Sequence, residues 1–267
     1  MRLDEALQTA RIDRADGEVL LAALLGQDRA WLMAHGGDAL PANREEQWKA
    51  YADRRRRHEP VALILGQKEF YGRMFTVTPA TLVPRPATEE LVSLALEVLK
   101  GGKPGRTMKM IDTGIVALAF VREDPRGAED VVDIGTGSGC IAVTLACERP
   151  DLRVIATDVS ATAIAVAKKN AYRHGADDRI EFREGSLLEP VTGLREPFLI
   201  VSNPPYIPED RELPPDVSLY EPEQALYAGK DGLAVLRPLV AAAHKHPACL
   251  GIVVECEQAQ VERLSAL

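Results

Sequence analysis

The sequence lacks the features that would place the chain in a membrane or a secretory pathway. Its 267 residues contain no signal peptide and no apolar run of about 18 residues, the length that spans a bilayer. Only four cysteines are present, and none of them is spaced as Cys-x-x-Cys. We interpret them as reduced packing residues, with neither a disulfide framework nor a metal site. These absences predict a cytoplasmic protein without a bound metal.

The sequence also lacks the excess of positive charge that dominates binding to nucleic acids. Lys and Arg number 32 against 40 Asp and Glu, which gives a net charge of −8. Long-range attraction to a polyanion is therefore not expected, and a folded protein is the better partner. The arginine run at 54–57 is interpreted as the solvated C-terminal end of a helix. We expect a monomer with no direct specificity for nucleic acid.

What is present is a helical segment followed by alternating strands and helices. Residues 1–60 carry apolar positions at helical spacing and predict a small helical domain. Residues 61–84 read as short β-type pieces and predict a β-hairpin linker. From residue 85 to 267 strands alternate with helices, which predicts a doubly wound, Rossmann-like α/β sheet. The elements expected in this third part are helices at 88–99, 141–147, 161–173 and 233–243 and strands at 131–134, 154–158, 180–183, 198–202 and 251–255.

One stretch, residues 101–129, interrupts this alternation. Glycine- and proline-containing turns at 101–105 and 124–127 bracket an apolar run from Met108 to Val121. The run is too short to cross a membrane. We expect an insertion that packs on the surface of the domain, directly before the strand at 131–134.

A glycine-rich turn follows that strand and predicts a nucleoside-binding site. Its sequence is Gly135-Thr136-Gly137-Ser138-Gly139, and a helix follows it. Glycines allow positive φ and close approach of a ligand, while the helix N-terminus offers unpaired N–H groups. Asp158 ends the next strand, where a carboxylate can accept hydrogen bonds from both ribose hydroxyls. These residues fit NAD and S-adenosylmethionine alike, so the choice between them must come from elsewhere.

The fourth predicted strand ends in Asn203-Pro204-Pro205-Tyr206, a pattern suited to holding an amide or amine nitrogen. In a doubly wound sheet this strand end lies beside the glycine-rich turn. An amide nitrogen is a poor nucleophile because its lone pair is delocalised, so it needs acceptors rather than a base. The side-chain oxygen of Asn203 and the carbonyl of Pro204 can accept its two N–H bonds. Two prolines keep these acceptors fixed, and the Tyr206 ring can pack on the amide plane.

With these motifs the chain resembles the release-factor glutamine methyltransferase family, from about residue 14 to 260 outside 101–129. Further matching stretches are Pro60-Val61, Leu65-Gly66, Phe70-Tyr71-Gly72, Leu82-Val83-Pro84-Arg85-Pro86, Thr88-Glu89-Glu90-Leu91, Tyr220-Glu221-Pro222 and Ala225-Leu226. The resemblance implies that 135–139, Asp158 and Asn203 bind S-adenosylmethionine, with Ser186 and Leu187 near the adenine, and that S-adenosylhomocysteine is the product. It implies that residues 203–206 and Arg85 bind the glutamine of a Gly-Gly-Gln loop, and that residues 1–60 help to grip the release factor.

The chain departs from the family pattern at several positions. Ala87 and Ser186 stand where the family usually has acids, and Phe198 stands where an Asp often precedes the fourth strand. The sequence ends before two final antiparallel strands that the family implies and that would cover a sheet edge, which leaves instability or pairing with a partner strand as the alternatives. The alternatives are methylation of a ribosomal-protein glutamine or of adenine-N6 in nucleic acid, NAD-dependent oxidoreduction, and an inactive homologue that only binds.

Overall fold

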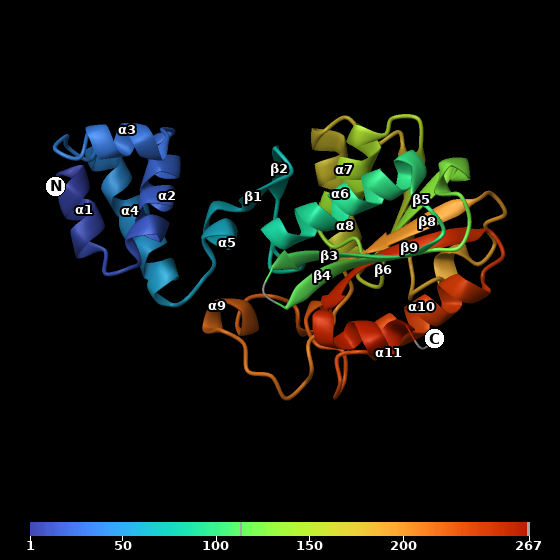
Figure 1. Ribbon diagram of the computed structural model, residues 1–267. Coiled ribbons are helices and arrows are strands. Elements are labelled where there is room, and N and C mark those ends of the chain that lie inside the picture. Colours follow the sequence, from blue (N-terminus) through green and yellow to red (C-terminus); the bar gives the residue numbers. More distant parts are fainter. Residues whose placement is uncertain (113, 266–267) are drawn as a thin grey trace. The chain divides into compact units, whose positions relative to one another are not determined.

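The structure, a computed structural model, describes residues 1–112 and 114–265 and divides into two compact units (Figure 1). The first unit comprises residues 1–67 and 213–220, and the second comprises 68–212 and 221–267. Residue 113, within the expected insertion, and residues 266–267, at the end of the expected third part, lie outside the described residues. The three-part division stays a prediction, because two compact units do not test whether residues 61–84 are a separate linker.

The first unit is a cluster of short helices around its own apolar core. Its helices are α1 (Leu3–Thr9), α2 (Arg14–Leu25), α3 (Arg29–Ala34), α4 (Ala42–Arg56), α5 (Val61–Leu65) and α9 (Pro215–Ser218). Asp13 and Asp28 begin α2 and α3 by accepting backbone N–H bonds of the first turn. Leu20, Leu21 and Trp48 are buried in the core that these helices share. The prediction of a helical N-terminal region is therefore confirmed.

One detail of this unit differs from the expectations. Val61–Leu65 is a helix rather than a β-type piece, because Pro60 begins it, Gly66 ends it at φ +69°, and Arg54 donates to the carbonyls of Leu63 and Ile64. The arginine run lies at the C-terminal end of α4, as expected, and its side chains at 54–56 also pair with acids. Arg54 pairs with Glu59, Arg55 with Asp16 at 2.6 Å, and Arg56 with Asp53.

The second unit is built on a seven-stranded sheet with the order β3-β4-β9-β8-β5-β6-β7. Its elements are β2 (Arg73–Thr76), α6 (Pro86–Gly101), β3 (Gly105–Asp112), β4 (Ile115–Val121), η1 (Pro125–Gly127), β5 (Asp130–Ile134), α7 (Cys140–Glu148), β6 (Arg153–Asp158), α8 (Ala161–Arg173), β7 (Ile180–Glu184), η2 (Glu189–Val191), β8 (Phe198–Ser202), η3 (Glu223–Ala225), α10 (Leu236–Lys245), β9 (Cys249–Glu257), η4 (Gln258–Gln260) and α11 (Val261–Ser265), while β1 (Gln67–Phe70) pairs with β2 in a separate hairpin. Strands β9, β8, β5, β6 and β7 run parallel. This order confirms the predicted doubly wound, Rossmann-like sheet.

Residues 105–121 correct the expectation of an insertion on the domain surface. They form the antiparallel hairpin β3–β4, and β4 pairs antiparallel with β9, with Leu118 opposite Val254. Every residue of β4 is apolar and most are buried, so this strand belongs inside a sheet. The edge of β9 that faces away from β8 is therefore covered by β4. The outer strand β3 is mostly exposed and carries Arg106 and Lys109, charges of the kind that protect an edge.

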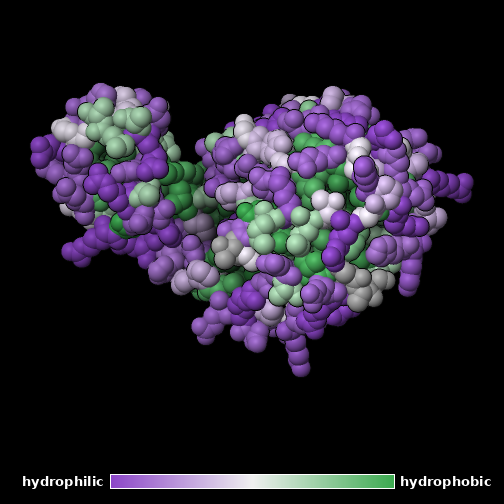
Figure 2. All heavy atoms as spheres, in the orientation of Figure 1, coloured by the Kyte–Doolittle hydropathy of each residue, from purple (hydrophilic) through white to green (hydrophobic). Residues whose placement is uncertain are grey.

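Helices cover both faces of this sheet and leave two apolar layers (Figure 1). Alternate residues of the central strands point to opposite faces, so Val131 packs with α6 and α7 while Val132 packs with α10 and α11. Three of the four cysteines are buried in these layers, which fits their interpretation as packing residues. In Figure 2 hydrophilic residues cover much of the visible face of each unit. The sheet is thus a rigid support for the loops at its carboxyl edge.

Candidate active site

The glycine-rich turn leaves β5 and opens into a cavity of about 300 Å³. Gly135 has φ +73° and Gly137 has φ +54°, and a Cβ added to either would meet no atom within 4 Å. Both positions therefore leave open space that a ligand can enter. Gly139 does not line the cavity. A Cβ there would lie 3.0 Å from the Cβ of Ala167, so this glycine lets α7 pack closely on α8.

Asp158 lines the same cavity from the end of β6. Its Oδ2 accepts a hydrogen bond from the Gly137 N–H at 2.9 Å, and its Oδ1 accepts one from the Ser160 N–H at 2.9 Å. Each carboxylate oxygen can accept more than one bond, so both can also receive ligand hydroxyls. Asp158 consequently braces the glycine-rich turn as well as facing the ligand space.

Two buried polar side chains that were not predicted as site residues form hydrogen bonds with the glycine-rich turn. Asn170 of α8 donates from Nδ2 to the carbonyl oxygens of Ser138 at 2.8 Å and of Thr76 at 2.9 Å. Asp133 accepts from the Thr136 hydroxyl at 2.7 Å. Burial raises the pKa of the Asp133 carboxyl to about 7. Asp133 is indicated only by its position just before the glycine-rich turn, and Asn170, in the middle of α8, carries no sequence signal.

The end of β8 brings the second predicted motif to the first. β8 pairs parallel with β5, and the Ser202 hydroxyl donates to the Ile134 carbonyl at 2.6 Å. Asn203, Pro204 and Pro205 then line the cavity that the glycine-rich turn lines. The expectation that these two strand ends face a shared crevice is confirmed.

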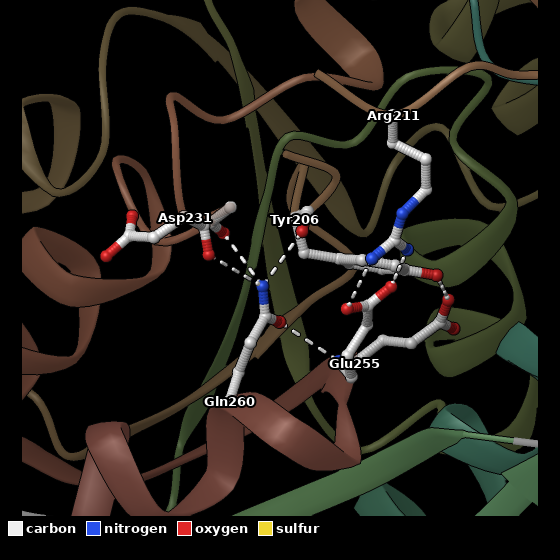
Figure 3. A network of polar contacts seen from close by, with 7 residues as sticks. Tyr206, Arg211, Asp231, Glu255 and Gln260 are labelled. Atoms are coloured by element: carbon white, nitrogen blue, oxygen red, sulfur yellow. Dashed lines mark hydrogen bonds and ion pairs between the residues drawn. The ribbon is translucent and has the colours of Figure 1, made fainter. Parts of the chain in front are cut away.

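Tyr206 lies differently from the ring-on-amide arrangement that its motif suggests. It is absent from the residues that line the cavity. Its hydroxyl donates to Oε1 of Glu255 at 2.8 Å, as Figure 3 shows. Burial and the charge of Glu255 raise the pKa of the Tyr206 hydroxyl well above its usual value, so it keeps its proton and remains a donor.

Gln260 fixes the backbone of the same turn from the other side (Figure 3). Its Nε2 donates to the Tyr206 carbonyl at 2.9 Å and to the Gly232 carbonyl at 3.2 Å, while its Oε1 accepts from the Glu257 N–H at 3.0 Å. A Cβ added to Gly232 would lie 2.2 Å from the Tyr206 carbonyl oxygen. The turn is therefore clamped by close backbone approach and by a buried amide.

Arg85 enters the cavity lining at the N-terminus of α6 and is paired there. Its Nη2 donates to Glu221 Oε1 at 2.6 Å, and Glu221 Oε2 also accepts from the Val83 N–H at 3.2 Å. The side chain of Glu221 is almost fully buried. Arg85 is thus held in one direction at the rim of the cavity, while its remaining N–H groups keep the capacity to donate.

Ser186 and Leu187 complete one wall of the cavity, next to Gly185. Leu187 has φ +48°, an uncommon conformation for a residue with a branched side chain. Backbone held in such a conformation is found mainly where a site requires it. The cavity is therefore enclosed by a glycine turn, a strand-end carboxylate, this wall and the Asn-Pro-Pro turn.

The described residues contain neither a cluster of metal ligands nor a membrane-spanning helix. Over residues 1–112 and 114–265, no group of three or more His, Cys, Asp or Glu side chains gathers as a metal site would require. In the same part of the chain, no helix is long and apolar enough to cross a membrane.

Comparisons with known proteins place the chain in a class. Residues 98–215 match the methyltransferase small domain, and residues 2–66 match the PrmC N-terminal domain. The chain is thus a methyltransferase of the Rossmann-like class with an N-terminal helical module.

The curated relatives narrow the class to one family. A release factor glutamine methyltransferase of Xylella fastidiosa (strain Temecula1) is 41% identical over 90% of this chain and 78% of its own length. Proteins of the same name from Bordetella pertussis and Geobacter sulfurreducens are each 40% identical, over 88% and 91% of this chain and 77% and 75% of their own lengths. The chain belongs to the release factor glutamine methyltransferase family.

Solved structures agree on the fold. The hMettl16 catalytic domain in complex with MAT2A 3′UTR hairpin 1 has a TM-score of 0.52 at 14% identity, covering 82% of this chain and 70% of that one. The complex with hairpin 6 has a TM-score of 0.51 at 15% identity, covering 82% and 71%. At these identities the likeness concerns the fold alone.

Proposed function

We propose that this protein transfers a methyl group from S-adenosylmethionine to the side-chain amide nitrogen of the glutamine in the Gly-Gly-Gln motif of a peptide chain release factor. The observation that carries the proposal is the shared cavity. Gly135 and Gly137 line it from one strand end, and Asn203 and Pro204 line it from the neighbouring strand end. Membership of the family supplies the substrate class.

The cofactor half of the cavity fits S-adenosylmethionine. The open space beside Gly135 and Gly137 admits a ligand close to the backbone, and the N-terminus of α7 follows directly. Asp158 would accept the ribose hydroxyls, and Ser186 and Leu187 would lie against the adenine. When bound, the cofactor supplies an electrophilic methyl group on a sulfonium that is already a good leaving group.

The substrate half of the cavity would orient the nitrogen that is methylated. The glutamine NH2 group would donate one hydrogen to the side-chain oxygen of Asn203 and the other to the Pro204 carbonyl. These acceptors stabilise positive charge that develops on nitrogen, and because proline and the Gln260 clamp fix them, no reorganisation is needed. Most of the rate enhancement then comes from alignment. As the N–CH3 bond forms and the S–CH3 bond breaks, the amide nitrogen would lose one proton to solvent water, which leaves S-adenosylhomocysteine and the N-methylated amide. Arg85 would contact the backbone of the substrate loop at the cavity rim.

The segment 101–129, one reason to consider an inactive homologue, does not disturb the strand that precedes the glycine-rich turn. Residues 105–121 complete the sheet beside β9 and leave β5 in register with β6 and β8. Residues 2–66, which make up most of the first unit, match the PrmC N-terminal domain. We propose that this unit binds the release factor.

Incubation of the purified protein with S-adenosylmethionine and a release factor, followed by mass spectrometry, tests the proposal. We expect the mass of one methylene group to be added to the peptide that contains Gly-Gly-Gln. Asn203→Ala should lower kcat about 100-fold, as loss of one charge-stabilising group does elsewhere, while the cofactor Kd changes less than about threefold. An unmodified peptide, or equal losses in kcat and cofactor affinity, would contradict the assigned role.

A further inference from the structure

Beside Asn203 lie two buried polar residues from distant parts of the chain, Thr88 near the start of α6, which also lines the cavity, and Glu255 near the end of β9, which does not. Thr88 is 3% exposed and Glu255 is 1% exposed. Asn203 Nδ2 donates to Thr88 Oγ1 at 2.9 Å, and Thr88 Oγ1 donates to Glu255 Oε2 at 2.9 Å. The three side chains therefore form one continuous hydrogen-bonded row that ends at the cavity.

The chemistry of these groups gives the row a single direction. An ionised carboxylate only accepts hydrogen bonds, and a threonine hydroxyl has one proton to donate. Because Glu255 takes that proton, the Thr88 oxygen can only accept from Asn203. The NH2 side of the Asn203 amide is then committed to Thr88, and its oxygen is left for the cavity.

The second oxygen of Glu255 is fixed in the same sense. Tyr206 donates its hydroxyl to Oε1, and the hydroxyl keeps its proton. Burial raises the pKa of the Glu255 carboxyl above its ordinary value, against hydrogen bonds from Tyr206, Thr88 and Asn203 and the positive charge of Arg85, which lower it. The donors on every side of the carboxylate thus match a group that accepts on both oxygens.

We propose that Thr88 and Glu255 are positioning residues that hold the Asn203 amide with its oxygen toward the substrate. The inference rests on the proposed function and adds the reason for its selectivity. An amide in the opposite orientation would present N–H donors to a substrate NH2 group, which also donates, and the two would repel. With the Asn203 amide in the observed orientation, the site binds a substrate group that donates hydrogen bonds and rejects one that only accepts them.

Two substitutions at Thr88 distinguish the effect of its hydroxyl group from the effect of its side-chain volume. Thr88→Val keeps the shape and removes the proton that Glu255 receives, whereas Thr88→Ser keeps the hydroxyl. Thr144→Val is the matched control, because Thr144 is a fully buried threonine whose hydroxyl has no hydrogen-bond partner among the described residues and which does not line the cavity. Thermal unfolding of all three variants identifies any that fail to fold.

Two measurements are made on each variant. In steady-state kinetics with a release factor, Thr88→Val should lower kcat about tenfold or more with the cofactor Kd within about twofold, and Thr88→Ser should restore most of the rate. The second measurement is NMR of isotope-labelled protein without substrate, in which the side-chain NH2 signal of Asn203 is identified by its loss in Asn203→Ala. The hydrogens of this NH2 group should exchange with solvent about tenfold more slowly in wild type and Thr88→Ser than in Thr88→Val.

The two measurements distinguish failure of the inference from failure of the proposed function. If wild type methylates the release factor but Thr88→Val equals wild type or Thr144→Val in kcat, the positioning role is overturned. If wild type does not methylate it, the proposed function fails, and exchange alone decides the amide orientation. Equal exchange in wild type and Thr88→Val then overturns the inference, and slower exchange in wild type supports it.

Discussion

Replacement of Gly232 by alanine tests how tightly the turn that follows Asn203 is held. Gly232 has φ +69°, and an added Cβ would lie 2.2 Å from the Tyr206 carbonyl oxygen and 2.5 Å from Gln260 Nε2. The left-handed backbone alone costs an alanine about 1 kcal/mol. Displacing the Gln260 amide leaves buried carbonyls unpaired, which costs a further 1–3 kcal/mol or so. We therefore expect Gly232→Ala to lower the free energy of unfolding of the second unit by roughly 2–4 kcal/mol.

Gly175→Ala is the matched control for this substitution. Gly175 also has positive φ, +62°, but an added Cβ would meet nothing within 4 Å, so only the backbone cost of about 1 kcal/mol applies. Both tryptophans lie in the first unit, so their fluorescence does not report on the second. Amide hydrogen exchange of the buried strand β9 does report on it. Equal losses of stability in the two variants would refute the idea that backbone contact at Gly232 clamps the turn.

Two further predictions concern the cofactor end of the site. Asp158→Ala should weaken binding of S-adenosylmethionine at least about tenfold in calorimetry, because it removes both the ribose acceptor and the hydrogen bond to the Gly137 N–H. The kcat at saturating cofactor should fall much less. A larger effect on kcat than on the cofactor Kd would count against this role. Burial raises the pKa of the Asp133 carboxyl from its ordinary 3.8 to about 7. The stability that this carboxyl contributes to the folded state is therefore fully present below about pH 4 and is lost as the pH rises through 7. Unfolding free energies of the second unit should therefore fall by about 2–3 kcal/mol more between pH 5 and pH 8 in wild type than in Asp133→Asn, and parallel pH profiles would contradict the assignment.

Local patterns sufficed to predict the parallel part of the sheet. The helix expected at 161–173 is found with those bounds, because Ser160 caps it and alanines favour it throughout. The strand expected at 198–202 is likewise found, since five buried apolar or small residues stand between polar turns. The meeting of Gly135 with Asn203 followed from topology, because neighbouring parallel strands end at the same edge.

Features that depend on long-range pairing could not be predicted in this way. The apolar run of β4 is the same whether it packs on a surface or joins a sheet, and only its partner β9, more than a hundred positions later, decides between them. The roles of Thr88, Glu255 and Gln260 were missed for a related reason. They stand at a helix start, a strand end and a short turn, where polar residues are ordinary, and their roles depend on partners that the sequence does not indicate.

The place of β9 in the sheet links the completion of folding to the assembly of the site. β9 comes after all the other described strands in the chain, yet it lies between β4 and β8. Until it is inserted, the hairpin β3–β4 and the parallel strands β8-β5-β6-β7 are two separate pieces that share no ladder. The insertion joins them and at the same moment delivers Glu255 behind Asn203, so a chain that has not closed its sheet also has no oriented amide to offer a substrate.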